Sequence, residues 1–215
     1  NNIESLEKLF EKYPGKIAAV ILEPMNIDYP QDNFLQKIKM LTSKNDTVLI
    51  FDEIITGFRF ARGGAQELFG VVPDLCAMGK GVANGYPLSI VAGRKDIMKL
   101  MEKVFFSSTF GGETLSLVAA KTLIEKLDRC SVLESIYQRG KQLLLGVKEL
   151  IDICWAKGME YVIVSPGSRN APLSISFAKD QRIKSLVIVD ERSAAYFALG
   201  IAQQTRKPVG LVCTS

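Results

Sequence analysis

Short continuous apolar runs alternate with segments of helical periodicity along the 215-residue chain, and this order most restricts the fold. The apolar runs are typical of strands buried on both faces of a parallel sheet. We expect such strands at 17–23, 47–53, 74–80, 87–93, 161–165, 185–190 and 208–214. We expect helices at 3–13, 32–44, 114–129, 132–157, 171–179 and 191–204. The alternation predicts a three-layer α/β fold with a mainly parallel sheet.

Charge and residue usage exclude several classes of function. The net charge is +4, and the 27 basic and 23 acidic residues are interspersed, so nothing favours binding to nucleic acid or to a membrane surface. The chain has no histidine, which removes Ser-His-Asp and Cys-His catalysis and most imidazole metal sites. No apolar run reaches 18 residues, and no secretory segment is found, so we expect a cytoplasmic protein.

The four cysteines are single residues without CxxC spacing: Cys76, Cys130, Cys154 and Cys213. This spacing argues against a structural metal site or a redox motif. We therefore expect buried free thiols and no bound metal.

Two chemically reactive side chains follow neighbouring strand-like segments. Asp52 is one of the two acids that end the run 47–53, and Lys80 lies between two glycines at the end of the run 74–80. Catalytic groups of open α/β sheets gather at the carboxyl ends of strands. A lysine amine can form an imine with an aldehyde, and a carboxylate can hold a proton on a pyridine nitrogen. Taken singly, Asp52 would be interpreted as a turn cap and Lys80 as a solvated loop residue; together they favour a cofactor site.

Four motifs within the first two-thirds of the chain resemble the class III pyridoxal-phosphate-dependent aminotransferases. They are FDEIITGFR (51–59), GGAQELFGVVPDL (63–75), MGKGVANGYPLSIVAG (78–93) and SSTFGGETLSLVAA (107–120). The resemblance covers about residues 1–145 and is strongest to the branch of glutamate-1-semialdehyde aminomutase. It implies part of a fold-type I large domain, pyridoxal 5'-phosphate as cofactor, and a small-molecule amine or keto substrate.

The same resemblance assigns roles to three residues. It implies that Lys80 is the catalytic lysine, which transfers an amino group through a Schiff base. Asp52 is then the partner of the pyridine nitrogen, and Thr109 reaches the cofactor phosphate of a neighbouring subunit.

The last third of the chain resembles a different family. The segments YVIVSPGSRNAPLSISFA (161–178) and LVIVDERSAAYFALGIAQQTRKPVGLVCTS (186–215) are similar to the beginning of 2-succinyl-5-enolpyruvyl-6-hydroxy-3-cyclohexene-1-carboxylate synthase, a thiamine-diphosphate enzyme of menaquinone biosynthesis. The similarity covers about residues 147–215. It implies part of the pyrimidine-binding domain of such enzymes, built as a βαβαβ unit.

This second resemblance also implies site residues. Glu191 matches the glutamate that bonds the aminopyrimidine ring, and Ser168 and Arg169 match residues that bind substrate carboxylates. Without the resemblance, Glu191 would be interpreted as an acid that favours the dipole of a helix N-terminus. Arg169 would be interpreted as a loop residue paired with a surface acid.

We expect both sites to be incomplete. The phosphate anchor of the first family and the magnesium-binding domain of the second have no counterpart in the chain. Pyridoxal phosphate should therefore bind weakly, thiamine diphosphate and magnesium should not bind, and Glu191, Ser168 and Arg169 should be vestigial. We predict domains at 1–146 and 147–215, with the seam inside a helix.

The combined prediction is a fusion of an aminotransferase or aminomutase fragment with a thiamine-diphosphate synthase segment, impaired or inactive as it stands. A non-enzymatic chimeric α/β scaffold and a carboligase fragment are the alternatives. Partial sheets expose unpaired edges. We therefore expect one of two outcomes: the last three strands extend the first sheet, or the chain forms homo-oligomers through an exposed sheet edge.

Overall fold

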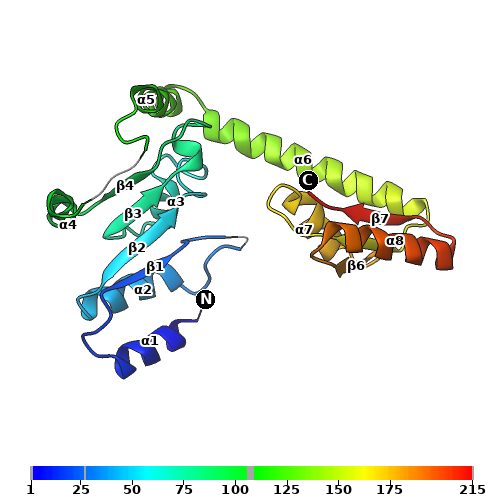
Figure 1. Cartoon of the computed structure of the whole chain (residues 1–215), viewed down its shortest axis with the longest axis horizontal. Coiled ribbons are helices and arrows are strands. Elements are labelled where there is room, and N and C mark those ends of the chain that lie inside the picture. Colours follow the sequence, from blue (N-terminus) through cyan, green and yellow to red (C-terminus); the bar gives the residue numbers. More distant parts are fainter. Residues whose placement is uncertain (1, 27, 106–108, 215) are drawn as a thin grey trace. The chain divides into compact units, whose positions relative to one another are not determined.

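The chain forms two compact units, each with its own sheet (Figure 1). The computed structural model describes residues 2–26, 28–105 and 109–214, and the units are Asn1–Leu133 and Glu134–Ser215. The first sheet has the order β1-β2-β3-β4 and the second the order β6-β5-β7. The α/β class with mainly parallel pairing is confirmed. The expectation that the last three strands extend the first sheet is wrong, because in the described residues they pair only with one another.

The first unit is built on three parallel strands and one antiparallel strand. The strands are β1 (Ala19–Leu22), β2 (Val48–Glu53), β3 (Leu75–Met78) and the antiparallel β4 (Ile90–Gly93). The helices are α1 (Ile3–Lys12), α2 (Phe34–Lys44), α3 (Gly64–Phe69), α4 (Lys95–Met98) and α5 (Thr114–Arg129), with 3-10 turns η1 (Lys80–Val82) and η2 (Lys99–Lys103).

The two faces of the first sheet differ sharply in burial. Leu49 and Phe51 of β2 are fully buried and pack against Ile38 of α2. On the opposite face Ile21 is 65% exposed and Val91 51% exposed. Side chains alternate between the two faces of a strand, so Asp52 lies on the more exposed face of the sheet, whereas Phe51 and Glu53 lie on the buried face.

Side-chain caps account for three helix beginnings. The Asn2 Oδ1 atom accepts a hydrogen bond from the Ser5 N–H at the beginning of α1. Glu113 accepts from the first free amides of α5, and Asp190 accepts from the Ser193 N–H in α8 (Glu191–Thr205). These caps satisfy amide groups that a helix leaves without internal partners.

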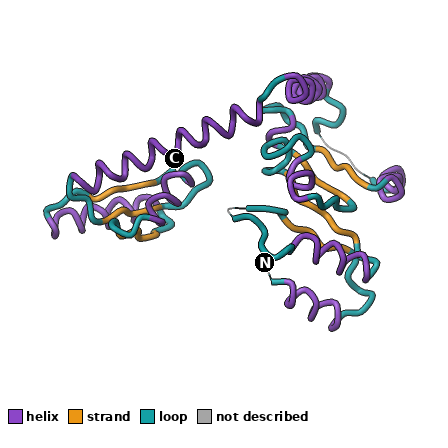
Figure 2. The backbone as a smooth tube through the Cα atoms, turned by 180° about the vertical axis from the view of Figure 1, so that it is seen from behind, coloured by secondary structure: helices purple, strands orange, loops and turns teal. Residues whose placement is uncertain are grey.

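The second unit is a three-layer sandwich around β5 (Tyr161–Val164). This strand lies between β6 (Lys184–Val187) and β7 (Val209–Val212), and all pairs are parallel. The helices α6 (Val132–Ala156) and α7 (Ala171–Lys179) pack on the face that carries Val162 and Val164. The helix α8 packs on the other face, against Ile163 (Figure 2).

The helix α6 contains the sequence interval in which we expect the seam. The compact units divide earlier, between Leu133 and Glu134, near the beginning of this helix. The predicted boundary between residues 146 and 147 separates the two family resemblances, not the two compact units, and it stays a prediction.

The cysteines are free, but only one of them is buried. Cys76 lies in the core of the first unit, Cys154 is partly exposed, and Cys130 and Cys213 are exposed. The expectation of four buried thiols is therefore wrong for these last two, which lie at the end of α5 and just after β7 and face water. Among the described residues, no helix combines the length and apolarity needed to cross a membrane.

Candidate functional site

Asp52 and Lys80 lie on the same edge of the first sheet. Asp52 of β2 is aligned with Ala77 of the neighbouring parallel strand β3. Lys80 follows three residues after Ala77, directly beyond the end of β3. Parallel strands end at a common edge, so the fold brings the two predicted residues to neighbouring positions there.

The two consecutive acids of β2 have different environments. Glu53 is fully buried and accepts hydrogen bonds from the Thr56 hydroxyl at 3.0 Å, the Ala65 N–H at 2.6 Å and the Gln66 N–H at 3.0 Å. Asp52 is half-buried, and its Oδ1 atom accepts from the Ile54 N–H at 3.1 Å. No donor within the described residues contacts the Asp52 Oδ2 atom. Asp52 is therefore the acid that is free to bind a ligand, and Glu53 organises the loop that follows.

Lys80 has a strained backbone conformation. Its φ angle is +44°, in the left-handed region that residues with a Cβ atom rarely adopt. Its side chain is exposed, and no described acid forms an ion pair with it. Such conformations cost about 1–3 kcal/mol and cluster at functional sites. Six other described residues with a Cβ atom also have a positive φ angle, among them Phe58 and Arg206, so the strain gains weight at Lys80 only through its position at the end of β3.

Thr109 is not brought into contact with the other two predicted residues. It is exposed in a turn before α5, and no hydrogen bond in the described ranges joins it to Asp52 or Lys80. The serines of the same motif, Ser107 and Ser108, lie outside the described residues. The predicted role of Thr109 in a neighbouring subunit stays a prediction.

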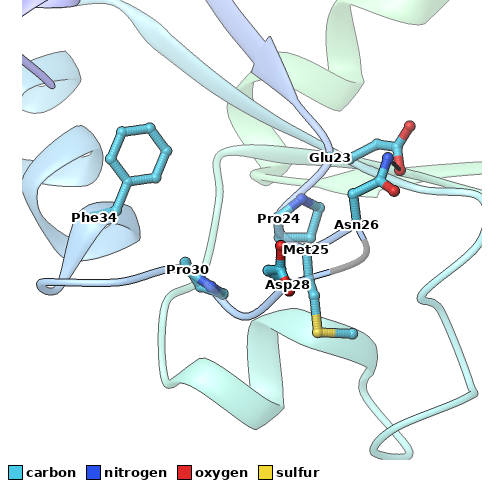
Figure 3. Close-up of a pocket in the computed structure, with 7 residues that line it drawn as sticks. All are labelled: Glu23, Pro24, Met25, Asn26, Asp28, Pro30 and Phe34. Carbon is cyan, nitrogen blue, oxygen red and sulfur yellow. Dashed lines mark hydrogen bonds between the residues drawn. The ribbon is translucent and has the colours of Figure 1, made fainter. Parts of the chain in front are cut away.

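A shallow hollow of about 310 Å³ lies at the carboxyl end of β1 (Figure 3). Glu23 and Asn26 line one side, with the Asn26 amide donating to a Glu23 carboxylate oxygen at 3.3 Å, and the Phe34 ring lies on the other side. Because Leu22 is aligned with Phe51, Glu23 is level with Asp52 on this edge. Our sequence reasoning missed Glu23, although an acid directly after a buried strand was a usable signal.

A second hollow of about 350 Å³ lies between the loop after η1 and α5. Its lining is mostly apolar and includes Ala83, Tyr86, Leu115 and Val118. The loop that carries Lys80 therefore borders apolar surface on the side of α5.

In the second unit, one buried amide organises the loop that carries the predicted anion-binding residues. The Asn170 side chain accepts from the Gly167 N–H at 3.0 Å and donates to the Ser165 carbonyl at 2.9 Å. Ser168 and Arg169, which lie between them in the chain, are exposed. Sequence reasoning missed Asn170 because it was interpreted as part of a motif rather than as a side chain that satisfies the turn.

Glu191 is exposed at the first position of α8, and the cap of this helix is its neighbour Asp190. The loop after β5 and the beginning of α8 after β6 lie at the carboxyl ends of adjacent parallel strands. A hydrogen bond from the Ser165 hydroxyl to the Ile188 carbonyl at 2.8 Å joins them. The fold thus places Ser168, Arg169 and Glu191 along one edge of the second sheet.

Two family models match the chain and overlap within α6. Residues 1–153 match the aminotransferase class-III model, and residues 146–215 match the model of the N-terminal TPP binding domain of thiamine pyrophosphate enzymes. The glutamate-1-semialdehyde 2,1-aminomutase of Francisella philomiragia is 39% identical over 156 residues, which cover 69% of this chain and 36% of that protein. The enzyme of the same name from Archaeoglobus fulgidus is 37% identical over 159 residues, 71% of this chain and 38% of that protein. The chain thus spans little more than a third of these relatives.

Solved structures agree with this assignment. An omega-transaminase from Sphaerobacter thermophilus superposes with a TM-score of 0.58 at 33% identity, over 70% of this chain and 36% of that chain. The FumI protein of Sphingopyxis sp. MTA144, described as a PLP internal aldimine form, superposes with a TM-score of 0.65 at 24% identity, over 71% of this chain and 38% of that one, and supports the fold alone. Since the first family model spans most of the chain, the protein belongs to the class III aminotransferase family.

Proposed function

We propose that residues 1–153 carry pyridoxal-phosphate-dependent amino-group transfer or amino-group migration, with Lys80 as the catalytic lysine. The observation that carries the proposal is the placement of Asp52 and Lys80 at the ends of adjacent parallel strands. The left-handed backbone of Lys80 supports it together with this placement, since such conformations cluster at functional sites.

Pyridoxal phosphate needs protein partners at its ring nitrogen, at its aldehyde carbon and at its phosphate, and the residues present fit the first two. The Asp52 Oδ2 atom has no donor among the described residues, so it can accept a hydrogen bond from a protonated pyridine nitrogen. The Lys80 amine is exposed and can reach an aldehyde carbon. Thr109, also exposed, is the candidate for the phosphate, and we place it toward the cofactor of a second copy.

Each residue has one task in this proposal. When bound, the cofactor supplies a conjugated ring that accepts electrons from the substrate carbon. The uncharged Lys80 Nζ atom would hold the cofactor at its aldehyde carbon, and it would also be the group that moves a proton to or from the substrate carbon. Asp52 keeps a proton on the ring nitrogen. Glu53 contributes only by fixing the loop after β2, through its bonds to α3.

The decisive experiment is chemical trapping at Lys80. Pyridoxal phosphate is added, the imine is reduced with borohydride, and peptides are mapped by mass spectrometry. We expect saturable labelling at Lys80, its loss in Lys80→Ala, and its retention in Lys44→Ala, which removes an exposed lysine at the end of α2. Equal labelling of many lysines, or an unchanged visible absorption band in Lys80→Ala, would contradict the proposal. Either result would favour the interpretation of the chain as a non-enzymatic scaffold, which the sequence analysis left open.

A second proposal concerns residues 146–215. Their likeness to a thiamine-enzyme domain, together with Ser168, Arg169 and Glu191 on one sheet edge, supports descent from the menaquinone-pathway synthase named above. We propose that these residues are vestigial here. Calorimetric titration with thiamine diphosphate and magnesium should show no saturable binding, and Glu191→Gln should leave the titration unchanged. Binding that Glu191→Gln abolishes would revive the carboligase alternative.

A further inference from the structure

The chain contains a single Asn-Gly pair, Asn84 and Gly85, in the loop that follows Lys80. An asparagine before a glycine is chemically labile, because the backbone nitrogen of the glycine can attack the amide carbon of the asparagine side chain. Glycine has no Cβ atom, so neither this approach nor the rotation of the backbone is hindered. The local structure decides whether the pair reacts in the folded chain.

Both reacting groups are accessible and free of other contacts. Asn84 and Gly85 are exposed. Within the described ranges, the Gly85 N–H donates to no acceptor, and the Asn84 side chain forms no hydrogen bond. The space around Gly85 is open as well, since nothing lies within 4 Å of a Cβ atom built there. The described part of the loop therefore has room to rearrange around the pair.

A single turn keeps the pair away from its reactive geometry. The φ angles of Asn84 and Gly85 are +48° and +111°, and the Tyr86 N–H donates to the Ala83 carbonyl at 3.2 Å. These features are typical of a type I′ turn. The attack requires Asn84 to rotate out of the left-handed region, so this turn must open first. Since opening breaks one hydrogen bond, the turn should slow the reaction by about tenfold or less.

Asn33 provides an internal comparison. Its φ angle is +55°, it is exposed, and its side chain makes no capping hydrogen bond at the beginning of α2. The next residue, however, is Phe34, whose side chain crowds the backbone nitrogen and whose N–H donates to the Gln31 carbonyl at 2.9 Å. Asn33 thus resembles Asn84 in conformation and exposure but lacks a free nucleophile. The other described asparagines all form side-chain hydrogen bonds: Asn2, Asn26, Asn45 and Asn170.

We propose that Asn84 deamidates spontaneously in the folded chain and thereby changes the loop that carries Lys80. The Gly85 nitrogen bonds to the Asn84 Cγ atom, the Cγ–Nδ2 bond breaks, and ammonia leaves with the proton of the Gly85 N–H. Water then opens the resulting succinimide ring at either of its two carbonyl carbons. One product is aspartate. The other is isoaspartate, in which the backbone passes through the side-chain carbons and gains one methylene group.

These products act on a backbone that is fixed on one side. Val82 and Ala83 are buried and pack with Ala120 of α5. The Val82 N–H donates to the Gly79 carbonyl at 3.1 Å, and this bond closes the turn around Lys80. A new negative charge and an added methylene group directly after Ala83 disturb this packing. The left-handed conformation of Lys80 then loses part of its support.

Peptide mapping by mass spectrometry tests the site. The purified chain is incubated for days at physiological pH and temperature, and a second sample is incubated in urea. In the folded chain Asn84 should convert at least about tenfold faster than Asn33, and it should convert no more than about tenfold slower than in urea. Asn84→Gln should remove the signal, because glutamine would have to close a larger ring. Equal conversion of Asn33 and Asn84, or conversion of Asn84 in urea alone, overturns the proposal.

Hydrogen exchange tests the effect on the loop. In the converted chain the Val82 amide should exchange about threefold faster or more, whereas the amides of β2 keep their protection. Unchanged exchange at Val82 would overturn this effect.

The consequence for chemistry rests on the proposed function. Borohydride labelling of Lys80 should fall as Asn84 converts, and Asn84→Gln should keep its labelling over the same incubation. An equal fall in both chains would show that general ageing is the cause and would overturn the link to Lys80. Failure of labelling in the fresh chain would contradict the proposed function, but it would leave the deamidation of Asn84 and the exchange at Val82 untouched.

Discussion

The carboxylate of Glu53 occupies the space that a side chain on residue 64 would need. A Cβ atom built on Gly64 would lie 2.2 Å from the Glu53 Oε2 atom, and the φ angle of Gly64 is +77°. The glycine therefore serves two purposes, since it permits a left-handed backbone and lets α3 begin against a buried acid. This contact fixes the loop between Asp52 and the next strand.

Replacement of Gly64 by alanine should destabilise the first unit strongly. We expect a loss of about 1–3 kcal/mol from overpacking, in addition to about 1–2 kcal/mol for the left-handed backbone. Gly70→Ala is the matched control, because its φ angle is +65° but nothing lies within 4 Å of the added atom. Urea unfolding of both variants separates steric conflict from backbone strain. Equal losses would show that the contact with Glu53 has no energetic importance.

Truncation of Glu53 should also destabilise the first unit. Glu53→Ala leaves the buried amides of Ala65 and Gln66 without acceptors, which should cost about 2–5 kcal/mol. The control is Glu67→Ala, since Glu67 is exposed and its carboxylate accepts from the Gly63 N–H alone among the described residues. Hydrogen exchange should report faster exchange of the Ala65 and Gln66 amides in Glu53→Ala alone. Unchanged protection of these amides would contradict the assigned role.

Asp74 should make the stability of the first unit depend on pH. Burial alone would raise the pKa of Asp74, but bonds from the Leu49 N–H, Lys39 and Arg94 outweigh it and hold this pKa below its ordinary value. A group with a lowered pKa in the folded state stabilises above its unfolded pKa, and this contribution is lost as pH falls through the folded value.

The variant Asp74→Asn isolates this contribution. We expect it to lose about 1–3 kcal/mol at neutral pH, the range for hydrogen bonds to charged groups, and less at pH values below the folded pKa of Asp74. Urea midpoints of the wild type and the variant should therefore converge as pH falls toward that range. Asp46→Asn, at an exposed carboxylate, is the control for general effects of charge removal. A constant difference between Asp74→Asn and the wild type at all pH values would exclude the linkage.

Much of the local structure could be predicted from the sequence. The helices α5 and α7 begin and end at the predicted residues, because their apolar periodicity is clear and their first turns carry recognisable signals. The short helix α3 was missed because it begins at glycines, which disfavour helix, and is held by the distant Glu53. The helix propensity of the residues in α3 gives no information about a contact with an acid that lies elsewhere in the chain.

Sheet membership and the finer site geometry could not be predicted in the same way. Alternating strands and helices predict parallel pairing, but not which strands share a sheet, because pairing joins residues far apart in the chain. In the described chain β5 pairs with β6 and β7, and none of these three strands pairs with a strand of the first sheet. Likewise, the motif around Lys80 predicted its position at a strand end. Its left-handed φ angle is unusual for a lysine and was visible only in the folded chain.

The loop after β5 should depend on Asn170 and hardly at all on Ser168. The Asn170 side chain is 5% exposed and makes three hydrogen bonds, to the Ser165 carbonyl, the Gly167 N–H and the Ser174 hydroxyl. Asn170→Ala should therefore destabilise the second unit by about 2–3 kcal/mol, since buried partners lose their bonds. Ser168 is exposed, so Ser168→Ala should change the stability by less than about 0.5 kcal/mol.

Hydrogen exchange can assign this loss to one unit. In Asn170→Ala, amides of β5 and β7 should exchange faster, while those of β2 and β3 keep their wild-type protection, because the two sheets share no strand. The conservative variant Asn170→Asp keeps the acceptor oxygens but loses the donor to the Ser165 carbonyl, so its stability should fall between those of the wild type and Asn170→Ala. If both variants lowered protection in both sheets equally, the units would unfold as one, and the independence of their cores would have to be abandoned.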